Sequence, residues 1–342
     1  MSDIPVHSRR SLTVIIPNYN HAHFIVRCLN SILSQSRLPD EVLICDDAST
    51  DESLEVLDEI TRDHQIVRVI RNECNLGVDQ TLQRLLKEAS SELVLGCAAD
   101  DEIAPEFIRY CMEEAEAFSS FGMYMGYTVV RYGDRTTGEQ KEKLLAPNIN
   151  LRLTPDEFSQ VPHEIRPWLT NIISISSIIK RQYWIEVLGY CGRFGPQADV
   201  CYRALIAAKH GLSIIDRPGA IVYQRRGSYS AQNDSMAFHT RTAENYLELG
   251  RFIRSPEVRE YFPKKLREEL TKSWLSEAEA IICKKIQRQM NQTGQDYIFC
   301  FKKQMITGSF IARILAKIHS LSGALSLFWI RYQMRKLKRC FD

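Results

Sequence analysis

The sequence has 342 residues, of which 44% are hydrophobic and 25% are charged, and its formal net charge is +2. This composition is that of an ordinary globular protein, and the length suits one large α/β domain with a helical extension or two small domains. No apolar stretch reaches the roughly 18 residues of a membrane-spanning helix, and the polar start MSDIPVHSRRS does not resemble a signal peptide. We therefore expect neither a secreted nor a membrane-spanning protein.

Over the first 130 residues, segments with the pattern of buried strands alternate with segments of helical periodicity. The expected strands are LTVIIP (12–17), EVLICDD (41–47), IVRVI (66–70) and ELVLGC (92–97). Apolar residues at helical spacing follow each of these strands. This alternation predicts a parallel sheet with helices on both faces.

Polar residues follow each of the expected strands. They are Asn18, Tyr19 and Asn20 after the first, Asp46 and Asp47 after the second, Asn72, Asn75 and Gly77 after the third, and Asp100 and Asp101 after the fourth. In sheets of this kind, ligands bind beyond the carboxyl ends of the strands. We therefore expect these residues to converge on one edge of the sheet.

The later parts of the chain have a different pattern. Residues 131–165 are polar and contain proline, so we expect loops there, whereas apolar and helical patterns return over 166–223. After about residue 240 the periodicity is helical, without the alternation of strands. We expect a helical region at the C-terminal side.

The ten cysteines do not suggest a zinc site, because none forms a C-x-x-C pair and no histidine cluster accompanies them. Several lie on apolar helix faces or strands, as Cys28, Cys45, Cys97 and Cys111 do. We interpret them as small, reduced, hydrophobic side chains of a cytoplasmic protein.

Asp100 and Asp101 are adjacent carboxylates, and their mutual repulsion requires compensation. Oxygen ligands of this kind suit Mg²⁺ or Mn²⁺, with the oxygens of a diphosphate completing the shell. The alternative is that one aspartate caps the following helix and the other is solvated. The shared edge with Asp46 and Asp47 favours the metal site. No G-x-G-x-x-G or Walker A sequence follows the first strand, so a metal ion is expected to handle the phosphates.

Asp47 and Tyr19 are candidate contacts to a nucleobase. Asp47 is able to accept a hydrogen bond from a base N–H, and stacking of Tyr19 on a base is worth about 1–3 kcal/mol. For residues 46–51 the alternative is a turn with helix capping by Ser49 or Thr50. For Tyr19 the alternative is packing against the edge of the sheet.

Four motifs together resemble the family 2 glycosyltransferases of GT-A fold. They are VIIPNYN (14–20), DDASTD (46–51), NLG (75–77) and AADDE (98–102), in the order and at the approximate spacing of that family. The resemblance covers roughly residues 11–230 and implies a Rossmann-like α/β domain with a mostly parallel sheet flanked by helices. The expected organisation is a catalytic domain at 11–235, with a nucleotide-binding half (11–130) and an acceptor half (131–235), followed by a helical region at 236–342.

The resemblance also implies roles for individual residues. It assigns nucleotide binding to Pro17, Tyr19, Asp46, Asp47, Asn75, Gly77, Asp100 and Arg226. Within this set, Tyr19 stacks on the base, Asp47 contacts it, and Asp100 lies near the ribose and diphosphate. Asp101, together with Asp100, binds Mn²⁺ or Mg²⁺. Many members have a further acidic residue earlier in this run, so the metal site rests on fewer protein ligands here.

Asp199 and Arg226 also take their roles from the resemblance. Asp199 matches the aspartate that the family places at the start of a helix, where it takes the proton from the acceptor hydroxyl, a role worth about 10²–10⁴-fold. Its alternative is an N-cap, and Ala198 precedes it where members often have glutamate. Arg226 stands near a position that is often histidine, and arginine pairs with diphosphate oxygens without binding a metal. The alternative for Arg226 is a solvated basic loop.

The function implied by the resemblance is transfer of a single sugar, with inversion, from a nucleotide-diphosphate sugar to a glycan or lipid-linked acceptor. A UDP-sugar is the expected donor, and the expected setting is the synthesis of cell-surface polysaccharide or lipopolysaccharide. One alternative is a non-catalytic scaffold that binds glycans or nucleotide sugars. The other is a sugar nucleotidyltransferase, although the glycine-rich N-terminal signature of that class is missing.

The last part of the sequence combines an apolar helical face with basic residues. The basic residues after position 300 are Lys302, Lys303, Arg313, Lys317, Arg331, Arg335, Lys336, Lys338 and Arg339. A segment such as 309–340 is able to lie on an anionic membrane, which would place a cytoplasmic enzyme on the inner membrane face beside a lipid-linked acceptor. The alternative is a helix packed on the catalytic domain. No module that reads nucleic acid is recognised, so no nucleic-acid partner is expected.

Overall fold

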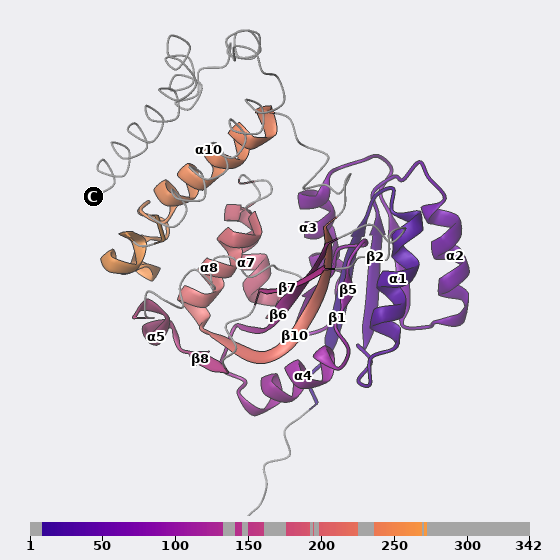
Figure 1. The fold of residues 1–342 in the computed structure, drawn as a ribbon, viewed down its shortest axis with the longest axis horizontal. Coiled ribbons are helices and arrows are strands. Elements are labelled where there is room, and N and C mark those ends of the chain that lie inside the picture. Colours follow the sequence, from indigo (N-terminus) through magenta and orange to yellow (C-terminus); the bar gives the residue numbers. More distant parts are fainter. Residues whose placement is uncertain are drawn as a thin grey trace, which may run out of the picture. The chain divides into compact units, whose positions relative to one another are not determined.

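The computed structural model describes residues 9–132, 141–145, 150–160, 176–191, 194, 198–224, 236–268 and 270–271. The chain forms two compact units, Met1–Arg225 and Arg226–Asp342. The first unit contains the sheet and the helices that cover it (Figure 1). In the second unit the described elements are α10 (Met236–Phe252) and the short 3₁₀ helix η3 (Arg259–Tyr261).

A ten-stranded mixed sheet organises the described part of the first unit. Its strands are β1 (Leu12–Asn18), β2 (Glu41–Asp46), β3 (Val67–Arg71), β4 (Leu93–Gly96), β5 (Glu102–Ile103), β6 (Met123–Tyr132), β7 (Lys141–Leu145), β8 (Leu151–Leu153), β9 (Ser177–Lys180) and β10 (Leu212–Gln224). Their order is β3-β2-β1-β4-β9-β6-β10-β5, with β7 beside β6 and β8 beside β10. Strands β1 to β4 are parallel, as are β6 and β10, whereas β9 runs antiparallel between β4 and β6. The four strands expected at the start of the chain are confirmed.

The prediction of loops over residues 131–165 was wrong in the described parts of that region. Strand β7 pairs with β6, strand β8 pairs with β10, and α5 (Pro155–Ser159) follows β8 behind a capping box at Thr154. The sequence of β7 is mostly polar and β8 has only three residues, so neither has a distinct strand pattern, and pairing with a neighbouring strand makes them extended. The sequence of β10 also has no continuous strand pattern. In the structure, its register with β6 shifts around Pro218.

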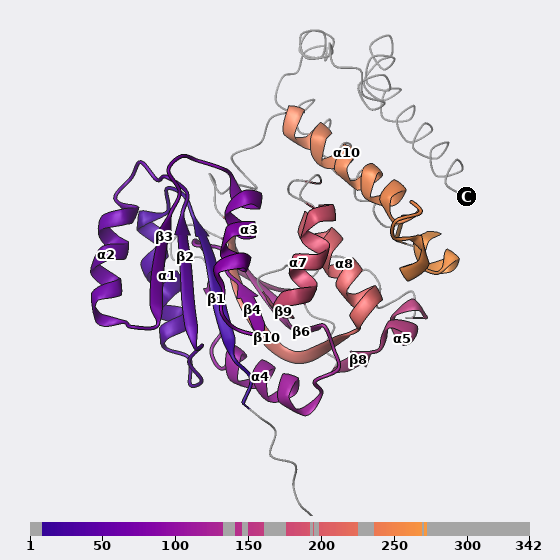
Figure 2. The ribbon, with the colours of Figure 1, turned by 180° about the vertical axis from the view of Figure 1, so that it is seen from behind.

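Two layers of helices cover the two faces of the sheet (Figures 1 and 2). One layer contains α1 (Ala22–Leu33), α2 (Ser53–Asp63) and α4 (Phe107–Ala117), and the other contains α3 (Val78–Glu88), α7 (Arg181–Cys191) and α8 (Ala198–His210). Successive side chains of a strand point to opposite faces, so the almost wholly apolar strands β1, β2 and β4 supply both layers. The predicted parallel core with helices on both faces is confirmed.

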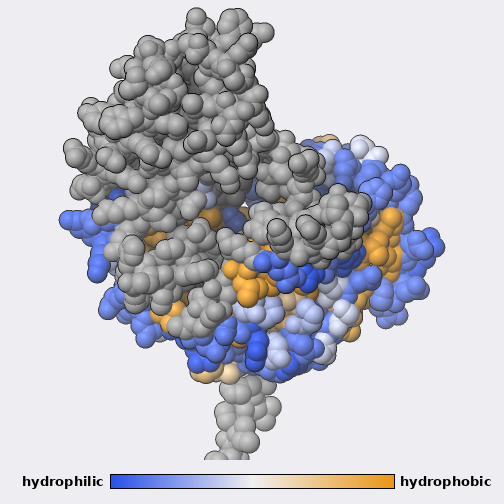
Figure 3. Space-filling view, in the orientation of Figure 1, coloured by the Kyte–Doolittle hydropathy of each residue, from blue (hydrophilic) through white to orange (hydrophobic). Residues whose placement is uncertain are grey.

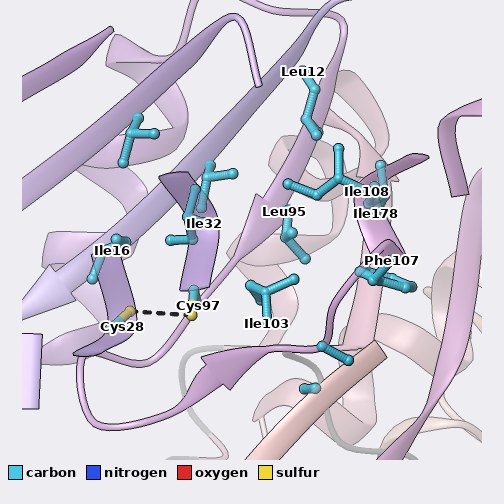
Figure 4. Packing of buried hydrophobic residues seen from close by; sticks show 14 of the residues in the cluster. Leu12, Ile16, Cys28, Ile32, Leu95, Cys97, Ile103, Phe107, Ile108 and Ile178 are labelled. Carbon is cyan, nitrogen blue, oxygen red and sulfur yellow. Dashed lines mark hydrogen bonds between the residues drawn. The ribbon is translucent and has the colours of Figure 1, made fainter. Parts of the chain in front are cut away.

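The main hydrophobic core lies between the sheet and the layer that contains α1 and α4. Figure 4 shows side chains of the strands, Leu12, Ile16, Leu95 and Ile178, packed with those of the helices, Cys28, Ile32, Phe107 and Ile108. The sulfur atoms of Cys28 and Cys97 are 3.5 Å apart, and both residues are free thiols. Cys45 and Cys111 are also buried and free, so these four cysteines pack as small hydrophobic side chains, as predicted.

Strand register brings the polar strand ends to one edge of the sheet. Asn18 pairs with Asp46 across β1 and β2, and Asp46 pairs with Arg71 across β2 and β3. Strand β4 ends at Gly96, opposite Ile15, and the chain then continues to Asp100 and Asp101 before β5 begins. The predicted residues that follow β1, β2 and β4 therefore lie at the carboxyl edge.

The described part of the second unit is helical, as predicted. Its buried apolar residues are Leu249, Phe252, Ile253, Val258, Phe262, Leu266 and Leu270.

Among the described residues, no helix is both long and apolar enough to cross a membrane. On the face that Figure 3 shows, the described surface is mostly hydrophilic, with separate hydrophobic patches. The basic segment 309–340 lies outside the described residues.

Candidate active site

Asp46 holds the turn that follows β2. Its carboxylate accepts hydrogen bonds from Asn18 Nδ2 at 2.9 Å, from the Ser49 backbone N–H at 3.0 Å and from Ser49 Oγ at 2.6 Å. The residue is 1% exposed. These contacts connect the turn to the end of β1, so the buried carboxylate of Asp46 stabilises the conformation of the turn. A direct contact of Asp46 with a nucleotide stays a prediction.

The turn interpretation of residues 46–51 is therefore confirmed, but capping by Ser49 or Thr50 is not. Helix α2 has Glu52 at its N-cap, and no side chain there bonds to the helix. Asp51 instead accepts hydrogen bonds from the backbone N–H groups of Ser53 at 3.1 Å and Ala22 at 3.0 Å. One carboxylate thus serves the first turns of two helices.

Asp47 holds the loop that leads into α3. Its carboxylate accepts hydrogen bonds from Asn72 Nδ2 at 2.7 Å and from the backbone N–H groups of Leu76 at 2.9 Å and Gly77 at 2.8 Å. Burial by itself raises the pKa of Asp47, but the hydrogen bonds from Leu76, Asn72 and Gly77 outweigh it, and its pKa lies below the ordinary value. A carboxylate is also favoured electrostatically at the N-terminus of a helix.

The NLG motif, which donates backbone hydrogen bonds to Asp47, leads into the first turn of α3. Asn75 Oδ1 accepts a hydrogen bond from the Gly77 backbone N–H at 3.1 Å, and Gly77 is the N-cap with a φ of 83°. This backbone conformation is unfavourable for residues with a Cβ atom, which explains the glycine. Asn75 and Gly77 thus line the same edge as Asp47, and Leu76 and Val78 beside them are exposed.

Tyr19 follows β1 on the surface of this edge. It is 41% exposed, so the alternative that it packs against the sheet does not describe it. Its carbonyl oxygen lies 2.6 Å from His21 Nδ1, which fixes the backbone of the loop. Pro17, in β1, pairs in register with Cys45 and supports the start of that loop. A planar ligand would find the Tyr19 ring accessible.

Asp100 and Asp101 lie in the tight turn between β4 and β5. The Asp101 backbone N–H donates to the Ala98 carbonyl oxygen at 3.1 Å, and Asp101 Oδ1 accepts from the Tyr223 backbone N–H at 3.1 Å. Asp101 is 7% exposed, whereas Asp100 is half-buried. The alternative that one of them caps the next helix is wrong, because α4 has Glu106 at its N-cap, without a capping hydrogen bond from its side chain.

The donor atoms of this turn fit a divalent cation that also binds phosphate. Among the described residues, no group of three or more histidine, cysteine or acidic side chains forms a complete metal site. Mg²⁺ bound to nucleotides commonly takes one or two carboxylates and completes its shell with phosphate oxygens and water. Asp100 and Asp101 match that smaller set of ligands.

Asp199 lies in the first turn of α8, one residue after its start at Ala198, and so inside the helix rather than at its N-cap. Its side chain is 30% exposed, and Arg203 Nη2 donates to Asp199 Oδ2 at 3.3 Å. Arg203 itself is 3% exposed, and its Nε donates to the Asp199 carbonyl oxygen at 3.0 Å. An arginine from the same helix therefore orients the carboxylate. Arg226, the remaining predicted residue, lies outside the described part of the chain.

Comparison with known protein families shows to which family this chain belongs. The model of glycosyl transferase family 2 matches residues 13–185, just over half of the chain. The chain belongs to this family. The match begins in β1 and ends within α7, so it includes the loops that carry Tyr19, Asp47 and Asp101.

Curated relatives of this family 2 chain share only part of their length with it. Chondroitin synthase of Escherichia coli is 33% identical over 103 residues, which cover 30% of this chain and 15% of that protein. The chain spans 10–15% of the length of the chondroitin and hyaluronan synthases that it matches. The aligned region is thus shared with these synthases, whose remaining length is much greater.

Solved structures confirm the GT-A-like fold of this family 2 chain. S. aureus TarS 1–349 in complex with UDP-GlcNAc has a TM-score of 0.52 at 16% identity, covering 84% of this chain and 93% of that one. Mannosyltransferase PcManGT from Pyrobaculum calidifontis, in complex with GDP-Man and Mn²⁺, has a TM-score of 0.51 at 18% identity, covering 97% of this chain and 85% of that one. At these identities the likeness establishes the fold.

Three side chains beside the Asp100–Asp101 turn were missed by the sequence analysis. They are Arg27 on α1, Glu102 on β5 and Tyr223 on β10. Glu102 ends the AADDE motif but was given no role, no motif marks Arg27, and the three residues lie far apart in the sequence. Pairing of β5 with β10 brings Glu102 opposite Ile221, two residues before Tyr223, and this pairing was not predicted.

Proposed function

We propose that this chain transfers a single sugar, with inversion, from a nucleotide-diphosphate sugar to a glycan or lipid-linked acceptor in the synthesis of cell-surface polysaccharide or lipopolysaccharide. The observation that carries the proposal is the edge at which exposed Tyr19, the loop held by Asp47 and the Asp100–Asp101 turn meet. Membership of family 2 and the nucleotide sugars bound by TarS and PcManGT support this choice of donor.

In the proposed donor complex, each part of the edge meets a different part of the nucleotide. The Tyr19 ring stacks on the base, a contact worth about 1–3 kcal/mol. The loop at Asn75 and Gly77, fixed by Asp47, closes around the base and ribose. Asp100 and Asp101 are the residues that would hold Mn²⁺ or Mg²⁺, which neutralises the charge of the departing diphosphate when bound.

Asp199 is proposed as the base on the acceptor side. As the acceptor oxygen forms its bond to the anomeric carbon, its proton passes to Asp199, and the bond from that carbon to the diphosphate oxygen breaks. The electron pair leaves with the nucleoside diphosphate, and attack from the opposite face inverts the anomeric configuration. One residue separates the end of α8 from the start of β10, so the first turn of α8 lies toward the carboxyl end of β10 (Figure 1).

A donor panel tests the proposal. The full chain is incubated with MnCl₂ and single UDP-sugars or GDP-mannose, with and without candidate acceptors, and release of UDP or GDP is measured. We expect one donor to be consumed in a manner that depends on the acceptor. Mn²⁺-dependent binding of UDP by calorimetry without turnover of any donor would favour the scaffold alternative instead.

The acceptor and the site of action are parts of the same proposal. The basic, amphipathic sequence 309–340 suits contact with an anionic membrane from its cytoplasmic side, where lipid-linked acceptors are found. Cosedimentation with vesicles that contain an anionic lipid, compared with vesicles of phosphatidylcholine alone, tests this contact. Equal sedimentation with both vesicle types would contradict it.

A further inference from the structure

Arg27 of α1 lies against the turn that carries Asp100 and Asp101. Its Nη2 donates to the main-chain carbonyl oxygen of Asp100 at 2.6 Å, and its Nε lies 2.6 Å from Glu102 Oε1. The side chains of Arg27 and Glu102 are 20% and 18% exposed, so most of this ion pair is removed from solvent. One guanidinium therefore contacts the residues on both sides of Asp101, in a segment with three consecutive acidic side chains.

Tyr223 of β10 contacts the same turn from the other side. Its ring lies 3.9 Å from Arg27 Cζ, and its hydroxyl donates to Glu102 Oε1 at 2.7 Å. Its backbone N–H donates to Asp101 Oδ1, and Arg131 Nη1 donates to its hydroxyl oxygen at 3.0 Å. A cation that is stacked on an aromatic ring, hydrogen-bonded to a main-chain carbonyl oxygen and adjacent to a carboxylate is held in one orientation.

These contacts join elements that are remote in the sequence. Arg27 comes from α1, Glu102 from β5, Tyr223 from β10 and Arg131 from β6. The turn itself is short and has neither a glycine nor a proline between β4 and β5 to fix its conformation. Contacts with Arg27 and Tyr223 therefore contribute to the position of this turn.

We propose that Arg27, stacked on Tyr223 and paired with Glu102, is a positioning residue that sets the Asp100–Asp101 turn for binding of the metal–diphosphate group of the donor. This inference rests on the proposed function, and it assigns Arg27 no contact with the donor. Loss of the guanidinium removes the hydrogen bond to the Asp100 carbonyl oxygen and the cation that lies beside Glu102. The turn then relaxes, and ligands displaced by a fraction of an ångström bind a cation less well.

A second half-buried ion pair offers a matched control. Arg37 Nη2 lies 2.7 Å from Glu116 Oε1, and the two side chains are each 19% exposed. Arg37 also donates to a main-chain carbonyl, that of Arg10 at 3.2 Å. It follows α1 near the amino ends of β1 and β2, at the opposite edge of the sheet. Arg27→Gln and Arg37→Gln thus remove similar interactions from opposite ends of the sheet.

The experiment compares the two variants in the full chain. UDP is titrated at a fixed MnCl₂ concentration, and MnCl₂ at a fixed UDP concentration, by calorimetry, and unfolding is followed in parallel. We expect both variants to lower the melting temperature to a similar extent. Arg27→Gln should weaken Mn²⁺-dependent UDP binding by about tenfold or more, whereas Arg37→Gln should stay close to wild type. Equal weakening in both variants, or wild-type binding by Arg27→Gln, overturns the proposal.

Two further variants should weaken UDP binding less than Arg27→Gln does. Arg27→Lys keeps the charge but loses the planar stacking on Tyr223, so UDP binding should lie between wild type and Arg27→Gln. Tyr223→Phe keeps the ring beneath Arg27 and the backbone N–H to Asp101, so it should weaken binding less than Arg27→Gln does. A larger loss in Tyr223→Phe than in Arg27→Gln would place the decisive contact elsewhere.

A readout that needs no nucleotide separates this proposal from the proposed function. Hydrogen exchange of the backbone amides of residues 98–103 should become faster in Arg27→Gln and stay unchanged in Arg37→Gln. If the wild-type chain binds neither UDP nor GDP with Mn²⁺, the proposed function fails while this measurement still tests the role of Arg27. Unchanged exchange over 98–103 in Arg27→Gln overturns the positioning role in either case.

Discussion

Asp46 and Asp47 are adjacent and chemically identical, yet their side chains hold different loops. The Asp46 carboxylate bonds back to β1 and to its own turn, and that of Asp47 bonds across to the loop before α3. Successive residues at the end of a strand point in different directions, which explains the division. Both buried carboxylates therefore organise the edge on which the exposed ring of Tyr19 lies.

Replacement of Asp47 by asparagine tests this organising role. Asp47→Asn should lower the free energy of unfolding by about 2 kcal/mol at pH 7, because three hydrogen bonds to a charged acceptor are weakened or lost. The pKa of Asp47 is lowered in the folded state, so its contribution is present above the ordinary aspartate pKa of about 3.9 and is lost as the pH falls through the folded pKa. The difference between wild type and variant should therefore shrink below about pH 4.

Chemical denaturation at pH 7, 5 and 3.5 measures that difference. Asp58→Asn is a suitable control, since Asp58 pairs with Arg71 on the surface with 55% of its side chain exposed. Such pairs contribute about 0–1 kcal/mol. A gap between wild type and Asp47→Asn that stays constant down to pH 3.5 would contradict the assignment.

Asp199→Asn tests the proposed base without changing the size of the side chain. The amide still accepts a hydrogen bond from Arg203 but takes up no proton, so kcat should fall by about 10²–10⁴-fold. Mn²⁺-dependent UDP binding should be unchanged, because no donor contact is assigned to Asp199. Turnover within a few-fold of wild type would exclude Asp199 as the base.

At the scale of elements, the contact of α7 with β4 depends on the absence of a side chain. Trp184 of α7 is 2% exposed, and a Cβ atom placed on Gly96 would lie 2.8 Å from its Cη2. Gly96 is the last residue of β4, directly before the chain turns toward Asp100 and Asp101. Close packing of the helix thus extends to the base of the proposed metal turn.

Gly96→Ala should destabilise the protein by about 1–3 kcal/mol, because the added methyl group forces Trp184 or β4 to move. Gly189→Ala, in α7, serves as the control. Apart from its chain neighbours and the backbone of its own helix, no described residue has an atom within 4 Å of a Cβ atom at Gly189, so alanine there should stabilise the helix by up to about 1 kcal/mol. Thermal unfolding that ranks Gly96→Ala at or above Gly189→Ala in stability would contradict this packing.

At the scale of the whole molecule, the proposed ligand should stabilise the fold that binds it. UDP with MnCl₂, at a free concentration about 100-fold above Kd, should stabilise the chain by about 2.7 kcal/mol. For a unit of this size that is roughly 5–10 °C in melting temperature. EDTA should remove the shift, and Asp101→Asn should not show it. An equal shift with EDTA present would exclude a role for the metal ion in binding.

The sequence was sufficient to predict the first half of the fold. Strands β1, β2 and β4 contain continuous apolar runs, and helices with apolar faces follow the strands, so the alternation of strands and helices predicts a parallel sheet. The same patterns predicted that Asp47 and Asp101 lie at one edge. They did not predict β7 and β8, whose extended form depends on partner strands.

What the sequence alone determined was which residue types end each strand, because hydrophobic periodicity fixes where strands stop. What only the tertiary structure decided was how those residues are held. Arg27 and Tyr223 reach the Asp100–Asp101 turn through the packing of α1 and the pairing of β5 with β10, and contacts over such separations cannot be predicted from the local sequence pattern. Burial decided the rest, because a carboxylate below the surface must take its hydrogen bonds from the protein.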